Sequence, residues 1–124
     1  MAGVLAEEHL SGALRAIGRS LAATPSDSLE WRVLVEAMVE TPRVPEVGEM
    51  TARLLDAYRA VMVQRLDRAV AAGELAAGSD TDALAMALLA MLDGVALYRT
   101  FIPGLDPERS IAAIAALFEC EEHE

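Results

Sequence analysis

The hydrophobic and polar positions of this chain repeat at helical spacing along nearly its whole length. Leu10, Leu14, Ile17 and Leu21, for example, recur three and four positions apart, which places them on one face of a helix. No run of β-branched residues alternates with polar ones, so nothing in the pattern predicts a strand. The pattern predicts an all-α fold of five helices, over about Val4–Ala23, Ser28–Glu40, Glu46–Ala72, Asp80–Phe101 and Pro107–Cys120.

Residues typical of helix ends support these boundaries. Asp27 is a predicted N-cap of the second helix, and Pro45 is predicted in the first turn of the third. Gly73 follows the third helix as a C-terminal cap, and Asp80 precedes the fourth as an N-cap. Asp106, followed by a proline and a glutamate, is a strong start for the fifth helix.

The fourth predicted helix is apolar over most of its circumference. One stripe carries small residues, namely Ala83, Ala87, Ala90 and Gly94, and the neighbouring stripe carries large ones, namely Leu84, Leu88, Met91, Val95 and Tyr98. Such a helix must be buried on several sides at once. This is difficult in a chain of 124 residues without a partner subunit. We therefore expect the small stripe to pack against a second subunit, and the large stripe to fill a core or line a cavity.

Composition and charge narrow the possible functions. Hydrophobic residues make up 54% of the chain and aromatic residues only 4%, which predicts an aliphatic core within one domain. The net charge is −10, and the ten basic residues are scattered arginines. Because phosphate contacts need clustered cations, we expect no binding of nucleic acid by this chain alone.

The chain has no sequence feature of a secreted or membrane protein. Its start has no basic region, and its longest apolar run, Ala83 to Leu92, is shorter than the roughly 20 residues that span a bilayer. The single cysteine, Cys120, excludes an intramolecular disulfide and fits a reducing compartment. We expect a soluble, cytoplasmic protein with no membrane partner.

Groups for metal or enzyme chemistry are sparse. The candidate soft ligands, His9, Cys120 and His123, are scattered and fit no known metal spacing. No pairing of a nucleophile with a base can be drawn from so few groups. We therefore expect no metal, no cofactor and no enzymatic activity.

From Ala71 onward the sequence resembles the C-terminal domain of TetR-family transcriptional regulators. The matching features are AAGEL at 71–75, Asp80 as a cap, ALLAMLDGVAL at 87–97, a Pro-Gly break and LDPE at 105–108. The resemblance implies that the last two helices form a four-helix bundle with their copies in a homodimer. It also implies that the other helices, with the penultimate one, enclose a cavity for a small-molecule inducer.

The resemblance does not extend to the DNA-binding part of that family. Only Met1-Ala2-Gly3 precedes the first predicted helix, so we expect residues 1–124 to be a single effector-binding and dimerisation domain without the N-terminal helix-turn-helix. Such a chain is either a longer regulator cut to its C-terminal domain or a naturally headless relative. The alternative function is a pure helical dimerisation or protein-interaction module with a packed core and no ligand.

Two sets of residues follow from these expectations. The predicted dimer interface consists of Ala83, Ala87, Ala90, Gly94, Phe101, Ile111, Ile114, Ala115 and Phe118. The predicted lining of a cavity for an apolar or amphipathic effector consists of Trp31, Val35, Met38, Tyr58, Met62, Leu88, Met91 and Val95. For each lining residue, and for Trp31 in particular, a purely structural place in the core is the alternative.

Two charged residues of the fourth helix admit both a structural and a functional interpretation. Asp93 has only leucine and alanine at its i±3 and i±4 positions, and we expect it to be partly exposed because a buried lone carboxylate is costly. Arg99 lies near the C-terminus of this helix, where the helix dipole and solvent favour a cation. Binding of an anionic ligand is the other possible role of Arg99.

Overall fold

The computed structural model describes residues 9–25 and 27–119, and these residues form five helices and no strand. The helices are α2 (Leu10–Ala23), α3 (Leu29–Glu40), α4 (Pro45–Ala71), α5 (Thr81–Tyr98) and α6 (Pro107–Ala116). The predicted all-α fold and its five helices are confirmed. The predicted beginning of the first helix at Val4 and the predicted end of the last at Cys120 lie outside the described residues.

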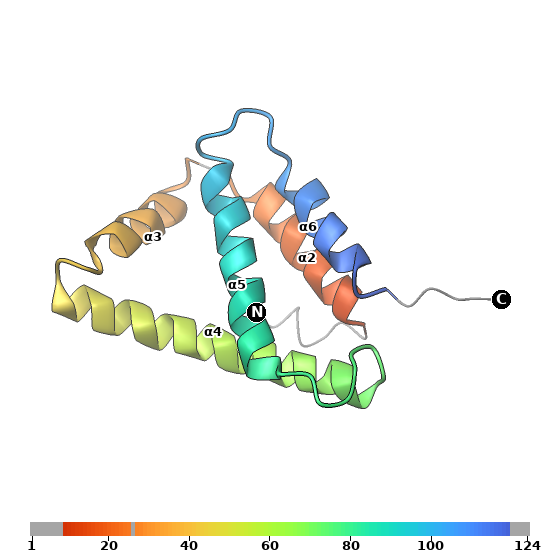
Figure 1. Ribbon diagram of the computed structural model, residues 1–124. Coiled ribbons are helices and arrows are strands. Elements are labelled where there is room, and N and C mark those ends of the chain that lie inside the picture. The colour runs from red at the N-terminus through yellow and green to blue at the C-terminus, as the bar shows by residue number, and fades with distance from the viewer. Residues whose placement is uncertain (1–8, 26, 120–124) are drawn as a thin grey trace.

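Helices α2 and α6 lie side by side and make the most extensive helix–helix contact of the described chain (Figure 1). Leu10 and Leu14 are buried on α2, and Ile17 and Leu21 pack against the same core, as their spacing predicts. A Cβ atom built on Gly18 would lie 3.2 Å from the Cβ of Ile111. Glycine at this position therefore lets the two helices approach closely.

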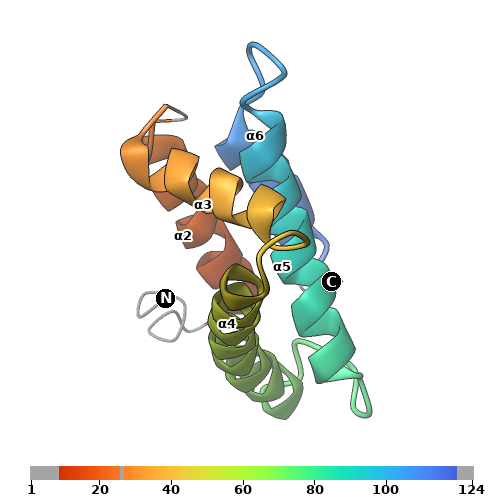
Figure 2. The ribbon, with the colours of Figure 1, turned by 90° about the vertical axis from the view of Figure 1, so that its left-hand side faces the viewer.

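The core lies between this pair, the second half of α4 and one face of α5. Met62, Leu66 and Ala69 of α4 are completely buried in it. Figures 1 and 2 show α5 crossing α4 beyond the middle of the longer helix. An ion pair of 3.4 Å between Arg59 Nη1 and Asp82 Oδ1 links the two helices at the surface.

The buried face of α5 is rotated from the predicted one. It consists of Ala85, Leu88, Leu89, Leu92 and Ala96. Leu88 belongs to the predicted large stripe, and Leu84 and Val95 of that stripe are partly buried against the core. Met91 and Tyr98 of the same stripe are 43% and 56% exposed. The predicted orientation was wrong for Met91 and Tyr98 because a helix that is apolar on nearly all sides has no strongly preferred face.

Most of the predicted helix ends are confirmed. Pro45 begins α4, Gly73 follows α4 with a positive φ of 79°, and the side chains of Asp80 and Asp106 cap α5 and α6. The predicted Asp27 cap is wrong by one residue. Ser28 caps α3 instead, and its hydroxyl accepts a hydrogen bond of 3.2 Å from the backbone N–H of Trp31.

The predicted end of the fourth helix at Phe101 is also too late, since α5 ends at Tyr98. Backbone hydrogen bonds continue as turns beyond this point, and Phe101 and Ile102 lie in the connection to α6. Gly104 takes a positive φ of 83° there. The helix therefore ends several residues before Pro103, the proline of the predicted proline-glycine break.

Helix α3 together with residues 45–60, the first half of α4, forms what we call the outer arm. Figure 1 shows α3, α4 and α5 as three sides of a triangle, with the α3–α4 connection at the corner farthest from α6. The hydroxyl groups of Thr41 and Thr51 hydrogen-bond at 3.1 Å across this corner. The outer arm has large apolar side chains on its surface, among them Leu29, Val33, Val39, Met50 and Leu54.

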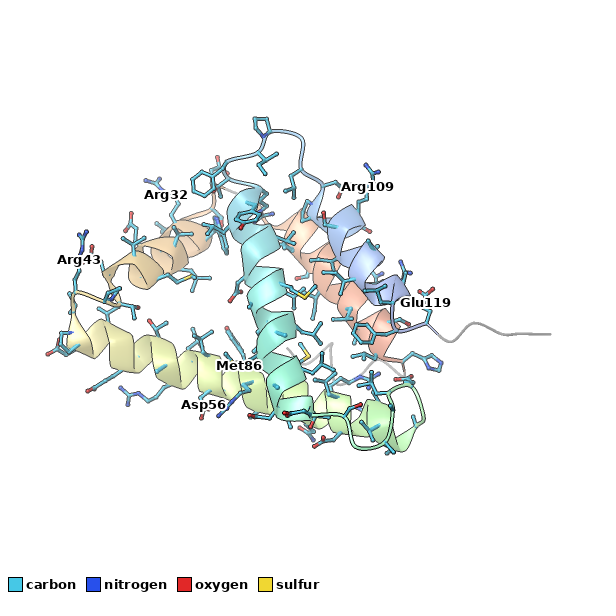
Figure 3. The ribbon with its side chains drawn as sticks, viewed as in Figure 1. Arg32, Arg43, Asp56, Met86, Arg109 and Glu119 are labelled. Carbon is cyan, nitrogen blue, oxygen red and sulfur yellow. The ribbon has the colours of Figure 1, made fainter. Side chains whose placement is uncertain are left out.

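Charged side chains link the start of α2 to the α4–α5 connection, and the middle of α2 to the residues after α6. Glu74, in the α4–α5 connection, accepts a hydrogen bond of 3.1 Å from the backbone N–H of Leu10. Its other carboxylate oxygen lies 2.8 Å from Nδ1 of His9. The same carboxylate lies 3.8 Å from Nη2 of the buried Arg65. On the far side, Arg15 of α2 pairs with Glu119, which Figure 3 places at the end of α6.

Candidate functional site

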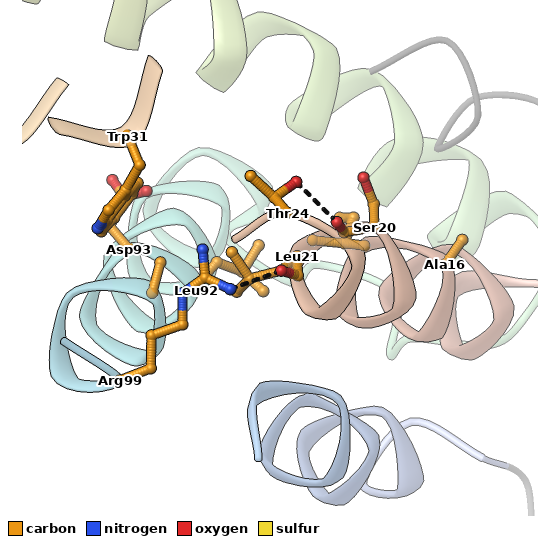
Figure 4. A pocket seen from close by; sticks show the side chains of 10 residues that line it. Ala16, Ser20, Leu21, Thr24, Trp31, Leu92, Asp93 and Arg99 are labelled. Carbon is orange, nitrogen blue, oxygen red and sulfur yellow. Dashed lines mark hydrogen bonds between the residues drawn. The ribbon is translucent and has the colours of Figure 1, made fainter. Parts of the chain in front are cut away.

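A partly open cavity of about 390 Å³ lies between α2, α3 and α5 (Figure 4). This volume is within the range of small-molecule sites in proteins. The lining consists of Ala16, Ile17, Ser20, Leu21 and Thr24 from α2 and its C-terminus, Trp31 from α3, and Leu92, Asp93, Ala96 and Arg99 from α5 and its C-terminus. Most of this lining is apolar, and its charged groups all come from α5.

Arg99 connects the three elements that form the cavity. It is the C-cap residue of α5, and its Nη1 donates a hydrogen bond of 2.7 Å to the carbonyl oxygen of Leu21 at the end of α2. Its guanidinium carbon lies 5.7 Å from the centre of the Trp31 ring, within the range of a cation–π contact. The positive charge of Arg99 therefore lies next to both the C-terminus of α2 and the indole of α3.

Several hydrogen-bond donors in this cavity have no acceptor. Among the described residues, Trp31 Nε1, Arg99 Nε and Arg99 Nη2 are buried and have no hydrogen-bond partner. A buried donor left unsatisfied costs roughly 1–3 kcal/mol, so folded proteins contain few of them. Trp31 and Arg99, both in the lining, therefore hold three donors that the subunit itself leaves unsatisfied.

Asp93 contributes a carboxylate to the same cavity. It is partly buried, and burial raises the pKa of this carboxyl group above its ordinary value. The ion pairs found among the described residues do not include Asp93. The expectation that Asp93 is partly exposed agrees with its position, but the residue also faces a cavity, which the sequence did not indicate.

The cavity differs from the predicted one in position. The prediction placed it between the second, third and fourth helices, and of the eight predicted residues only Trp31 is part of the observed lining. Met62 and Leu88 are buried in the core, Val95 packs against the core, Val35 is partly buried, and Met38, Tyr58 and Met91 are exposed. Ile17 and Leu21 were missed as lining residues because the sequence analysis assigned them entirely to the buried face of α2.

The predicted interface residues differ in how far the subunit itself covers them. Ala83, Ala87, Ala90 and Phe101 are exposed, and a Cβ built on Gly94 meets no atom within 4 Å. Ile114 of α6 and Phe118, which follows this helix, are partly buried and pack against the core. Ile111 and Ala115 have no exposed surface in the subunit, because they pack against α2 and the core. The surface proposed below for a partner therefore excludes these last two residues.

Comparison with known proteins identifies the family of the chain. A model of the C-terminal domain of BetI-type transcriptional repressors, one of the TetR C-terminal domain families, matches residues 8–119. The chain belongs to this family. No curated protein and no solved structure matches the chain significantly. The resemblance seen in the sequence is confirmed, and the chain has the role of a ligand-binding or dimerisation domain of a transcription regulator.

No group of three or more histidine, cysteine or acidic side chains that could hold a metal ion occurs among the residues that the structure describes, and Cys120 and His123 lie outside them. Helix α5 is long and apolar enough to cross a membrane by length and composition alone. Within the subunit, however, the exposed residues of α5 are limited to Asp82, Ala83, Met86, Ala87, Ala90, Met91 and Tyr98. This part of α5 is the most available to another molecule.

Proposed function

We propose that this chain is the regulatory domain of a TetR-family transcription regulator, which binds a small apolar or amphipathic effector and forms a homodimer. The observation that carries the first part is the cavity between α2, α3 and α5, with its unsatisfied donors. An effector bound there would contact three helices at once. The domain itself is proposed to act in the cytoplasm, without a cofactor and without binding DNA.

The position of α5 supports a link between effector binding and dimer formation. One side of α5 supplies Leu92, Asp93 and Arg99 to the cavity, whereas Ala83, Ala87 and other small residues are exposed. Effector binding at the first group would change the position or rigidity of the helix that carries the second. This arrangement favours an effector-responsive dimer over the alternative, a dimerisation module without a ligand.

The cavity is tested by titration with small apolar molecules, followed by Trp31 fluorescence and by the melting temperature. Trp31 is the only tryptophan of the chain and lines the cavity, so a ligand there changes its emission. Binding to the folded state alone also raises the melting temperature. Ser20→Phe should abolish both responses by filling the cavity from its exposed edge.

Ala22→Phe is the matched control for that variant. Ala22 is exposed on the same helix and is not part of the lining, so its variant should bind as the unchanged chain does. Failure of every compound to alter either signal would contradict the effector-binding proposal and favour the module without a ligand. Equal loss of binding in the two variants would contradict the location.

The homodimer is proposed to form through α5 and the exposed part of α6. Glycine costs a helix about 1 kcal/mol relative to alanine, and nothing in the subunit itself approaches Gly94. Close approach of a helix from a second copy is a physical reason for a glycine there. Leu117, 79% exposed at the end of α6, adds a large apolar side chain to the uncovered surface.

Sedimentation equilibrium at micromolar concentration, without detergent, tests this part of the proposal. We expect a dimer mass for the unchanged chain and for the control Ala22→Leu, and a shift toward monomer for Gly94→Leu. Circular dichroism should show that all three retain their helices. A clean monomer for the unchanged chain would refute the homodimer, and insolubility that only lipid vesicles relieve would favour a membrane partner for α5.

A further inference from the structure

The donors in the cavity indicate the chemistry of its ligand. We infer that the effector is an apolar molecule with one carboxylate group, and that this carboxylate binds the edge of Arg99 formed by Nε and Nη2. The inference rests on the effector site proposed above and specifies it. Its basis is that one nitrogen of the Arg99 guanidinium is hydrogen-bonded within the subunit and the other two are not.

The guanidinium group of Arg99 is fixed on one side and unused on the other. Nη1 donates to the carbonyl oxygen of Leu21, whereas Nε and Nη2 are buried and have no acceptor. Nε–H and the adjacent N–H of Nη2 lie along one edge of the planar group and point in nearly parallel directions. Two parallel donors at this spacing match the two oxygens of a carboxylate.

Other features of the cavity agree with a ligand that is apolar apart from this end. Ile17, Leu21, Leu92 and Ala96 supply aliphatic surface beside Arg99. Trp31 adds an aromatic ring and, in Nε1, another buried donor without an acceptor. All three unsatisfied atoms are donors, so an acceptor-bearing ligand satisfies them and a ligand with only donors does not.

A cationic ligand fits this cavity less well. The ring of Trp31, which would otherwise attract a cation, already has the guanidinium of Arg99 at 5.7 Å. A second cation would be repelled by that charge. Asp93 is the one acidic group in the lining and opposes a carboxylate, so removal of its charge should strengthen binding of the proposed ligand.

Matched compounds with the same tail test the inference. Decanoate, decanamide and decylamine differ only in the polar end, and 4-phenylbutyrate tests whether an aromatic tail is also accepted. We expect decanoate to bind the unchanged chain roughly tenfold or more tightly than decanamide, the difference that charged hydrogen bonds provide. Decylamine should bind more weakly still.

Variants of the two charged lining residues should act in opposite directions. Arg99→Gln should remove the preference for decanoate over decanamide, Arg99→Lys should restore only part of it, and Asp93→Asn should increase the affinity for decanoate. Arg99→Lys keeps the charge but lacks the paired donors, so it separates the two contributions. It also provides a test if loss of the contact with Leu21 prevents Arg99→Gln from folding.

The outcomes distinguish this inference from the proposed effector site. If decanamide or decylamine binds as tightly as decanoate, and Ser20→Phe abolishes that binding, the site is correct and the carboxylate inference is refuted. If Arg99→Lys and Arg99→Gln both keep the full preference for decanoate, Arg99 is not the binding group and the inference is likewise refuted. If none of the four compounds binds, the result counts against both proposals.

Discussion

The α2–α6 pair and the outer arm differ in how far their own chain covers their apolar side chains. Leu10, Leu14 and Ile111 of the pair are at most 1% exposed, whereas Leu29 and Met50 of the outer arm are 76% and 65% exposed. Burial of apolar surface is the main source of stability. The pair therefore holds the subunit together, and the outer arm leaves surface that other molecules can cover.

The largest expected effect tests this difference directly. Ile111→Ala removes a completely buried side chain between α6 and α2, and we expect it to lower the free energy of unfolding by about 2–5 kcal/mol. Met50→Ala in the outer arm should change it by less than about 0.5 kcal/mol. Urea denaturation at one protein concentration measures both. Similar losses in the two variants would show that the outer arm is covered in solution.

A somewhat smaller effect is expected at the closest approach of the pair. Gly18→Val places side-chain atoms where Ile111 Cβ and Cγ2 already lie 3.2 and 3.3 Å from a built Cβ. Overpacking of this kind costs about 1–3 kcal/mol. Ala22→Val, at an exposed position of the same helix, is the control for the helix propensity of valine. Equal stability of the two variants would mean that α6 can move away from α2 without cost.

The sequence predicted the orientation of α2 correctly and that of α5 only in part, for one physical reason. Polar and charged residues such as Arg15 and Arg19 mark the solvent side of α2, so its apolar face is defined. Helix α5 has few polar residues, and any of several faces could be buried. The structure selects the face with Ala85, Leu89 and Leu92 because that face meets the core.

The cavity was only partly predictable because it depends on contacts between distant residues. Trp31 and Arg99 were each recognised as candidates from their own helices. In the structure Arg99 contacts the ring of Trp31 and also hydrogen-bonds to Leu21, 78 positions away in the sequence. Periodicity describes one helix at a time, so it does not specify how the end of α5 meets the end of α2.

A third variant tests the long-range cap of α2, with a moderate expected effect. Glu74 takes the place of a local capping side chain, since His9 makes no such bond and Leu10 N–H donates to Glu74 instead. Glu74→Ala should lower the free energy of unfolding by at least about 0.5–2 kcal/mol, because it removes the cap of α2 and also the carboxylate next to the buried Arg65. Glu36→Ala, at an exposed position of α3, should have no measurable effect. A neutral Glu74→Ala would mean that water caps α2 equally well.

The smallest effect is expected at Asp93, which lies on α5 and lines the cavity. Burial raises the pKa of this carboxyl group in the folded state above its unfolded value of roughly 4. Between these two pKa values the folded chain binds more protons than the unfolded one, so this group makes stability fall as pH rises. Its ionised form is therefore a net cost at neutral pH. Asp93→Asn should remove that cost.

The gain should be below about 1 kcal/mol at pH 7, because partial exposure screens the charge. It should disappear once the pH falls below the unfolded pKa, where both states hold the proton. Melting temperatures of the ligand-free chain and of Asp93→Asn between pH 3 and 8 measure this, with the exposed Asp27→Asn as control. A gain that is the same at every pH would arise from packing or hydrogen bonding of the amide. It would show that the charge of Asp93 does not oppose the fold, and that its effect on a bound carboxylate must be measured separately.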